Sequence, residues 1–284
     1  MESRETKQHL LKWIKLVKRC NEDEVFKKTV VELCKKDILF FINTFVFTYD
    51  PRTDLKKLPL ILYPFQERAV LKIEEKFRVK QPLLVEKSRD MGFSWFTLAW
   101  IIHHFLFDPG FSAGIGSYKA DLVDELGNMK SLMQRCRFIL NNLPDFLLQG
   151  WSEEKNSKYM SLVHPTLHTS ITGESGDNIG RGNRTSVYLL DEFAFIPRSS
   201  AVHAAVSQTT DCLIFGSTPN GKGNEFARLR FKGKEGKTQL AHTLNGSALA
   251  LPRIVASLLE NNQTDDGIAL PKVLHTYFGS NVIS

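Results

Sequence analysis

The sequence predicts an α/β fold whose sheet is mostly parallel and covered by helices on both faces. Short apolar runs typical of buried strands occur at Pro82–Glu86, Ser112–Ser117, Val187–Leu190 and Cys212–Gly216. Helical patterns separate the first three runs, at Phe93–Phe107 and Asp121–Leu140. Strands that alternate with helices favour parallel pairing, because each connecting helix returns the chain across one face of the sheet.

The flanking elements follow from the same patterns. Residues 1–58 form a predicted helical segment, with apolar side chains at helical spacing up to residue 48 and a loop at Tyr49–Leu60. We interpret this segment as a lid or adaptor on the main domain; the alternative is a basic surface helix that contacts DNA or a partner. Ser161–Val163 and His168–Thr172 predict a hairpin.

Composition limits the class of protein. The 284 residues are 42% hydrophobic and 24% charged, which is typical of a globular protein and argues against wholesale disorder. The net charge of +6 permits a polyanionic partner. The four cysteines show no CxxC spacing, which argues against a disulfide scaffold or a zinc site. We find no signal peptide and no apolar run long enough to span a bilayer, so we expect a cytoplasmic protein with no membrane partner.

The segment Val85–Ser94 (VEKSRDMGFS) has the context of a phosphate-binding loop, because it follows an apolar strand and opens a helix. It departs from the usual GxxxxGK[ST] pattern, since Phe93 stands where the lysine is expected. The alternative is a basic strand–helix turn without a ligand. The candidate nucleotide-binding residues here are Lys87, Ser88, Arg89, Gly92 and Ser94.

Two further strand ends carry polar residues. Val187–Leu190 is followed by Asp191 and Glu192, an arrangement in which the first acid orients Mg²⁺ and the second polarises water. The strand ending at Gly216 is followed by Ser217 and Thr218, which lie where a γ-phosphate would be sensed. Accidental matches of both patterns are common, and Pro-Asn-Gly at 219–221 is also an ordinary turn.

Upstream of the loop, Tyr63–Gln66 (YPFQ) places an aromatic side chain beside a glutamine. The Gln66 amide has the donor and acceptor that pair with adenine. Arg181 and Arg184, in the glycine-rich segment before Val187, are candidates for ATP or DNA contact, because transferred phosphoryl groups often need an arginine. A solvated basic loop is the alternative for both arginines.

Together, YPFQ, KSRDMGFS, VYLLDEFAFIP and GSTPNGKGNEF resemble the ATPase domain of the phage large terminase subunit, the motor that packages DNA into tailed-phage heads. The resemblance covers about residues 35–228 and implies a P-loop NTPase (RecA/terminase-like) fold at 59–228, with ATP and Mg²⁺ as cofactors.

The resemblance also implies residue roles. Gln66 would contact the adenine, and Lys87 and Arg89 the phosphates. Ser94 and Asp191 would hold Mg²⁺, and Glu192 would be the catalytic carboxylate. A second group has implied roles in catalysis, in close approach of the backbone and in coupling: Arg181, Gly92, Ser217 and Thr218.

The implied partners are double-stranded DNA, the portal protein, the small terminase subunit and further copies of the chain in a ring, in a bacterial host cell. Large terminases usually continue into a nuclease domain, and the 58 residues after Phe226 are too few for one. We therefore expect a truncated motor, such as a prophage remnant would encode, with no nuclease activity.

Residues 232–284 resemble the C-terminal end of bacterial seryl-tRNA synthetases. By that resemblance Arg253 would bind ATP phosphates, and Asn245 and Ser247 would lie near the serine site. We expect 229–284 to be a short α+β tail and not an independent domain, with a helix at Ala250–Asn261. The alternative functions are a seryl-tRNA ligase fragment and an inactive DNA-binding or pseudogene product.

Overall fold

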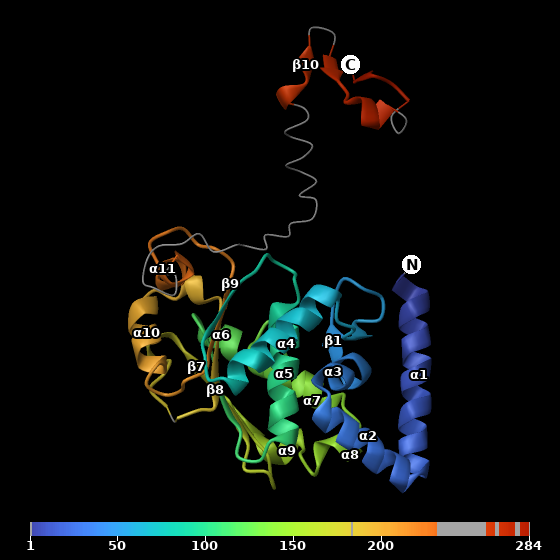
Figure 1. Ribbon diagram of the computed structural model, residues 1–284, viewed down its shortest axis with the longest axis vertical. Coiled ribbons are helices and arrows are strands. Elements are labelled where there is room, and N and C mark those ends of the chain that lie inside the picture. The colour runs from blue at the N-terminus through green and yellow to red at the C-terminus, as the bar shows by residue number, and fades with distance from the viewer. Residues whose placement is uncertain (1, 183, 232–259, 265–266, 276–278, 284) are drawn as a thin grey trace. The chain divides into compact units, whose positions relative to one another are not determined.

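A computed structural model describes residues 2–182, 184–231, 260–264, 267–275 and 279–283 (Figure 1). The chain divides into two compact units, Met1–Thr243 and Leu244–Ser284. Among the residues described, no helix combines the length and apolar character needed to cross a membrane.

The first unit is built around a seven-stranded sheet in the order β3-β9-β8-β4-β7-β6-β5. Its strands are β3 (Leu83–Glu86), β4 (Ser112–Ser117), β5 (Ser157–Lys158), β6 (Ser161–Val163), β7 (Ser170–Ser175), β8 (Val187–Asp191) and β9 (Leu213–Ser217). Neighbours from β3 to β7 pair in parallel, and β6 and β5 pair antiparallel at one end. The predicted α/β class with a mostly parallel sheet is therefore confirmed, and so is the antiparallel pair formed by β6 and β7.

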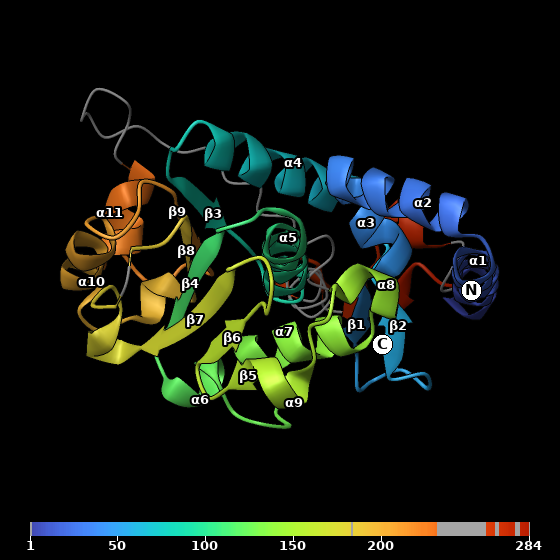
Figure 2. The same cartoon turned by 90° about the horizontal axis from the view of Figure 1, so that it is seen from below.

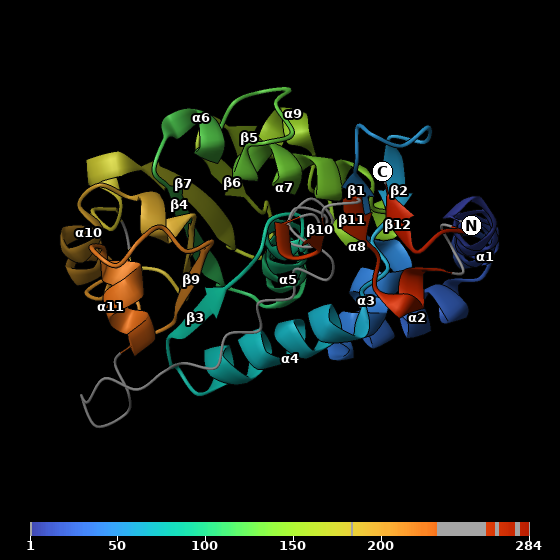
Figure 3. The same ribbon diagram turned by 90° about the horizontal axis from the view of Figure 1, so that it is seen from above.

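Helices cover both faces of this sheet (Figure 2, Figure 3). The helices of the first unit are α1 (Glu2–Glu22), α2 (Glu24–Lys36), α3 (Ile38–Phe45), α4 (Pro64–Arg78), α5 (Phe93–Phe107), α6 (Ala120–Val123), α7 (Leu132–Asn141), α8 (Asp145–Leu148), α9 (Glu153–Asn156), α10 (Ser199–Val206) and α11 (Glu225–Phe231). One core joins α3, α4, α5 and α7 to the sheet, and a second core lies under α10 and α11. Along β8, Leu189 enters the first core and Leu190 the second, as alternation along a strand requires.

Helix α5 is the central helix of the larger core. It is apolar on all sides, and all its residues from Phe96 to Phe107 are buried. A helix without a polar face is stable only when protein surrounds it. Because Ser94 lies in its first turn, this packing fixes the position of that side chain.

The predicted helix at Asp121–Leu140 is wrong, because the structure has two helices, α6 and α7, with an irregular segment between them. Gly127 has φ +79° in this segment, a conformation that glycine adopts without strain. Ser131 then begins α7, and its side chain accepts a hydrogen bond from the Gln134 amide at 3.3 Å. A helical hydrophobic pattern does not reveal such a break.

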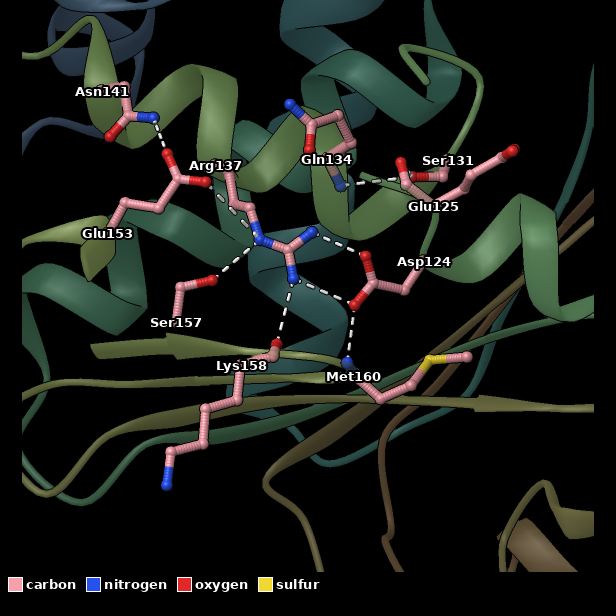
Figure 4. Close-up of polar contacts among 10 residues, drawn as sticks. All are labelled: Asp124, Glu125, Ser131, Gln134, Arg137, Asn141, Glu153, Ser157, Lys158 and Met160. Carbon is pink, nitrogen blue, oxygen red and sulfur yellow. Dashed lines mark hydrogen bonds and ion pairs between the residues drawn. The ribbon is translucent and has the colours of Figure 1, made fainter. Parts of the chain in front are cut away.

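A buried ion pair holds this break in place (Figure 4). The Arg137 guanidinium of α7 donates to both carboxylate oxygens of Asp124, at 2.6 and 2.9 Å. It also donates to the Lys158 carbonyl, and the second oxygen of Asp124 accepts from the Met160 amide. Four groups from α7, the α6–α7 segment and the β5–β6 hairpin therefore satisfy one another in the interior.

The N-terminal segment is helical up to Phe45, in three helices. Asp23 and Asp37 start the second and third helices, each by accepting a backbone hydrogen bond at 2.9 Å. The expectation of a loop over Tyr49–Leu60 is wrong in part, because β1 (Phe47–Tyr49) and β2 (Lys57–Pro59) form an antiparallel hairpin around it. The boundary at residue 58 stays a prediction.

In the second unit, β10 (Gln263–Thr264), β11 (Gly267–Ala269) and β12 (Val282–Ile283) form a small antiparallel sheet. Of the predicted helix at Ala250–Asn261, only Glu260 and Asn261 are described, and both are helical.

Asp124→Asn removes the charge that faces Arg137 and leaves the buried guanidinium with only the more distant carboxylate of Glu153, at 4.0 Å. We expect the free energy of unfolding to fall by about 3 kcal/mol, near the lower end of the usual cost of breaking a buried ion pair. Chemical denaturation of the full chain measures this change. The control is Asp177→Asn, which breaks the exposed pair with Arg198 and is expected to cost less than about 1 kcal/mol. Equal losses in the two variants would contradict a dominant role of the buried pair.

Candidate functional site at the carboxyl ends of the strands

The predicted polar residues gather at one edge of the sheet. Because β3, β9 and β8 are parallel neighbours, their carboxyl ends lie side by side. Glu86 is in register with Ser217, and Gly216 with Asp191. The phosphate-loop candidate, the acid pair and the Ser217 strand end therefore share an edge, as the sequence led us to expect.

A compact polar cluster joins the loop to the acid pair. Ser94 Oγ donates to Asp191 Oδ2 at 2.6 Å, and Lys87 Nζ donates to Glu192 Oε1 at 2.7 Å. Lys87 Nζ also lies 3.4 Å from Asp191 Oδ1. The Lys87 and Asp191 side chains are only 12% and 9% exposed, whereas Glu192 is 29% exposed and so accessible to water. Burial opposes the charge on Lys87, but the two carboxylates outweigh it and raise the pKa of this amine.

The backbone at Glu192 is unusual. Its φ of +54° lies in the left-handed region, which non-glycine residues rarely adopt, and its amide donates to Asp191 Oδ1 at 3.1 Å. A short 3₁₀ turn, Phe193–Phe195, follows directly. Backbone strain of this kind is frequent at functional sites.

Phe93 occupies the position where the usual loop has lysine, and its ring packs on β9. A methyl group added at Gly216 would lie 2.0 Å from Phe93 Cε1, so only glycine fits under the ring. Lys87 Nζ lies 5.5 Å from the centroid of the same ring. The cation that the loop lacks at Phe93 is thus supplied at the end of β3.

The Gln66 side chain lies against the loop, with both polar ends on backbone groups. Its Oε1 accepts from the Tyr63 amide at 2.9 Å, and its Nε2 donates to the Met91 carbonyl at 3.0 Å. A methyl group at Gly92, which has φ +73°, would lie 2.7 Å from Gln66 Nε2. Gln66 therefore positions the loop, and its contact with adenine stays a prediction. The Tyr63 and Phe65 rings stack nearby with centroids 6.0 Å apart.

Ser217 connects the loop to the acid pair. Its carbonyl accepts from the Lys87 amide at 3.0 Å, and its fully buried hydroxyl accepts from the Ala194 amide at 3.1 Å. The hydroxyl in turn donates to the Thr218 carbonyl at 2.9 Å. Direct bonds thus join the Lys87 backbone to the turn that follows Glu192.

The other predicted residues are less closely placed. Ser88 is half-buried beside Lys87, and Arg89 is exposed. Arg181 is exposed on the segment after β7, where its charge acts on Asp177. Arg184 lies at the opposite edge of the sheet, since the neighbouring Thr185 amide bonds to the Thr209 carbonyl just before β9. Three tail candidates lie outside the described residues: Asn245, Ser247 and Arg253.

Sequence reasoning missed Arg135 of α7. Its guanidinium lies 5.3 Å from the centroid of the Trp95 ring, and its Nε donates to the Met129 carbonyl at 2.8 Å. Trp95 directly follows Ser94, so Arg135 lies over the first turn of α5. Burial lowers the pKa of this guanidinium, and the nearby Asp191 carboxylate opposes that shift. The sequence signal that could have found Arg135 is a cation placed between the apolar residues Leu132 and Ile139.

The cluster fits a divalent cation such as Mg²⁺. Ser94 and Asp191 direct a hydroxyl and a carboxylate oxygen to one point, and Mg²⁺ prefers oxygen ligands shared between protein, water and phosphate. Among the described residues, no group of three or more His, Cys, Asp and Glu side chains forms a complete protein cage for a metal.

Solved structures resemble the first unit. The large terminase of bacteriophage HK97 aligns with 67% of this chain and 39% of its own, at 15% identity and a TM-score of 0.50. The chain shares its fold with phage large terminases. The large terminase of a thermophilic bacteriophage, in complex with ADP, aligns with 63% of this chain and 44% of its own, at 12% identity and a TM-score of 0.46.

The curated relatives are serine–tRNA ligases. That of Salinibacter ruber is 60% identical over 55 residues, 19% of this chain and 13% of the ligase. That of Chlamydia pneumoniae is 38% identical over 96 residues, 34% of this chain and 21% of the ligase. That of Elusimicrobium minutum is 48% identical over 179 residues, 62% of this chain and 38% of the ligase, so this match extends beyond residues 232–284.

The chain therefore spans well under half the length of these ligases. No protein-family model matches the chain. Both resemblances inferred from the sequence, to large terminases and to seryl-tRNA synthetases, are confirmed.

Gly216→Ala places a methyl group 2.0 Å from Phe93 Cε1, which is too close for a van der Waals contact. We expect the free energy of unfolding to fall by about 2 kcal/mol, because overpacking a core commonly costs about 1–3 kcal/mol. Adding Phe93→Leu frees space, so the double variant should lose less than the sum of the single losses. Gly223→Ala, where nothing lies within 4 Å, is the control. Additive losses in denaturant unfolding would show that the ring does not set this position.

Proposed function

We propose that the first unit is a Mg²⁺-dependent ATPase motor of the large-terminase type, which couples ATP hydrolysis to movement of double-stranded DNA. The observation that carries this proposal is the contact of Ser94 and Lys87 with Asp191 and Glu192 at the carboxyl ends of three parallel strands. The fold shared with large terminases supports the choice of reaction class.

In this proposal the loop binds the triphosphate and the acid pair serves the chemistry. Lys87 and the exposed Arg89 meet the phosphate charge that Phe93 cannot. Ser94 and Asp191 hold Mg²⁺, which neutralises phosphate oxygens when bound. Glu192, the more exposed acid, orients and polarises the attacking water.

The ion pair between Lys87 and Glu192 gives the site a second property. While Lys87 donates a hydrogen bond to Glu192 Oε1, that carboxylate oxygen is engaged. A triphosphate attracts the same ammonium group. Phosphate binding would therefore draw Lys87 away and leave Glu192 free to accept a hydrogen bond from water.

Coupling would follow the bonds of Ser217. Its contacts to Lys87 and Ala194 link the loop to the turn after Glu192. From there the Asn220 side chain donates to the Ala194 carbonyl at 3.2 Å, and the Asn224 side chain donates to the Asn220 carbonyl at 2.6 Å. This chain of bonds ends at the start of α11. Thr218 belongs to it through its carbonyl.

The partners remain those of the motor: double-stranded DNA, a portal protein, a small terminase subunit and further copies of the chain in a ring. Arg181 is exposed, and so its guanidinium is available to a nucleotide held by a neighbouring copy. Arg135 would instead act within its own chain, over Ser94.

Glu192→Gln keeps the size and hydrogen-bonding reach of the side chain but removes its charge. We expect the turnover number for ATP to fall by about 10²–10⁴-fold, the usual contribution of a general base, while binding of an ATP analogue is retained. Steady-state phosphate release by the full chain with Mg²⁺ measures this. Glu154→Gln, an exposed acid on α9, is the matched control. Equal turnover in wild type and Glu192→Gln would remove Glu192 from its role.

Arg135→Gln removes the cation over the first turn of α5. Loss of one charge-assisted hydrogen bond is worth roughly 1.5–3 kcal/mol. We expect kcat/KM for ATP to fall by about ten- to a hundredfold, with partial recovery in Arg135→Lys. Loss of the bond to the Met129 carbonyl should lower the free energy of unfolding by only about 0.5–1.5 kcal/mol, the usual net worth of one hydrogen bond. Lys130→Gln is the control, and unchanged kinetics in Arg135→Gln would exclude the residue from the site.

A second candidate function, a fragment of a seryl-tRNA ligase, is favoured by the curated relatives. Its implied site residues, Asn245, Ser247 and Arg253, lie outside the described part of the chain. Serine-dependent exchange of pyrophosphate into ATP by the full chain would favour this candidate, and exchange without serine would not.

A further inference from the structure

A pocket lies at the amino ends of the strands whose carboxyl ends carry the Lys87 cluster. This amino-edge pocket has a volume of about 730 Å³ and is lined by the end of α4, the segment before β8 and the connection from α10 to β9. These segments lie at the amino ends of β3, β8 and β9. The pocket is therefore about one strand length from the Lys87 cluster and connected to it by the strands themselves.

The lining of the amino-edge pocket is polar and basic. Arg78, Lys80 and Arg184 contribute three cations against one acid, Asp211, and five hydroxyl side chains lie among them. Arg78 pairs with Glu74 at 2.6 Å. Within the described residues Lys80 and Arg184 form no ion pair, so their charge is available to a ligand.

Two local features distinguish this pocket from an ordinary basic surface. Lys80 has φ +52°, a left-handed conformation held by the bond from its amide to the Phe77 carbonyl at 3.1 Å. The buried hydroxyl of Thr185 has no hydrogen-bond partner among the described residues. Buried polar groups are nearly always paired, and a bond from this hydroxyl to a ligand requires the Thr185 side chain to rotate toward the pocket, because the atom is closed to solvent in its present rotamer.

We propose that the amino-edge pocket binds the phosphodiester backbone of a nucleic acid strand. Lysine, arginine and hydroxyl side chains are the usual contacts to phosphate and sugar, and they carry no sequence preference. A pocket of this size with Phe77 as its one apolar lining residue suits an extended phosphate-bearing chain better than an apolar ligand. The choice of duplex DNA as the ligand rests on the proposed motor function. The binding of a phosphodiester backbone does not.

The position of the pocket gives it a use in the motor. Three strands begin beside the pocket: β3, which Lys87 follows, β8, which ends at Asp191, and β9, which ends at Ser217. Arg184 also lies three residues before β8, so a phosphate bound by Arg184 is joined to Asp191 through Thr185, Ser186 and the strand itself. A rigid buried strand transmits a displacement between these edges without a separate hinge.

The test measures duplex DNA binding by the full chain without nucleotide, by fluorescence anisotropy over a range of salt concentrations. The pocket variant is Lys80→Gln with Arg184→Gln. The charge-matched control is Lys155→Gln with Lys158→Gln, two exposed lysines on α9 and β5. We expect the pocket variant to bind at least about tenfold more weakly. The slope of log affinity against log salt should also become shallower by about two, since each phosphate contact contributes about 0.9.

Thr185→Val gives an independent readout, because it removes only the unpartnered hydroxyl. We expect DNA affinity to fall about threefold, the effect of one neutral hydrogen bond, with no loss of thermal stability. Identical affinity and salt slope in the pocket and control variants would overturn the proposal. Loss of inorganic tripolyphosphate binding in the pocket variant, with DNA binding kept, would assign the pocket to a free phosphate compound and also overturn it.

Nucleotide-free binding separates this proposal from the proposed function. If the chain hydrolyses no ATP but the pocket variant loses DNA, the motor proposal fails and the pocket proposal stands. If ATP turnover depends on Glu192 but the pocket and control variants bind DNA equally, the motor proposal stands and the pocket proposal fails.

Discussion

The parallel pairing of β3, β9 and β8 is the constraint on which the candidate site depends. Residues far apart in the sequence, Lys87, Asp191 and Ser217, each follow or end one of these strands. Parallel register brings all three to the carboxyl ends of the strands. Ser217 then fixes their spacing, because it accepts hydrogen bonds from the Lys87 amide and from the Ala194 amide. The side chains could not form this cluster from an antiparallel sheet, because one strand would then end on the far side.

The strands and the acid pair could be predicted because their signals are local. Four apolar runs predict buried strands. The polar residues that follow them, such as Asp191, indicate where each strand ends. The break at Gly127 could not be predicted, since its stabilising contact joins Asp124 to Arg137 across the fold. Arg135 was missed for a similar reason. Its importance comes from stacking on Trp95, a tertiary contact that no spacing rule encodes.

The two resemblances differ in kind. The candidate nucleotide site is built from residues between Tyr63 and Thr218, all within the first unit. The relation to serine–tRNA ligases is one of sequence and is strongest over short stretches, whereas the relation to large terminases is one of fold at low identity.

The burial of α5 has a thermodynamic consequence. Ser94 lies in the first turn of a helix whose residues from Phe96 to Phe107 are all buried, so the candidate site is anchored to the hydrophobic interior. Sub-global opening events that free such a helix lie near the top of a protein's opening energies. Loss of the candidate site on heating should then coincide with cooperative melting of this unit.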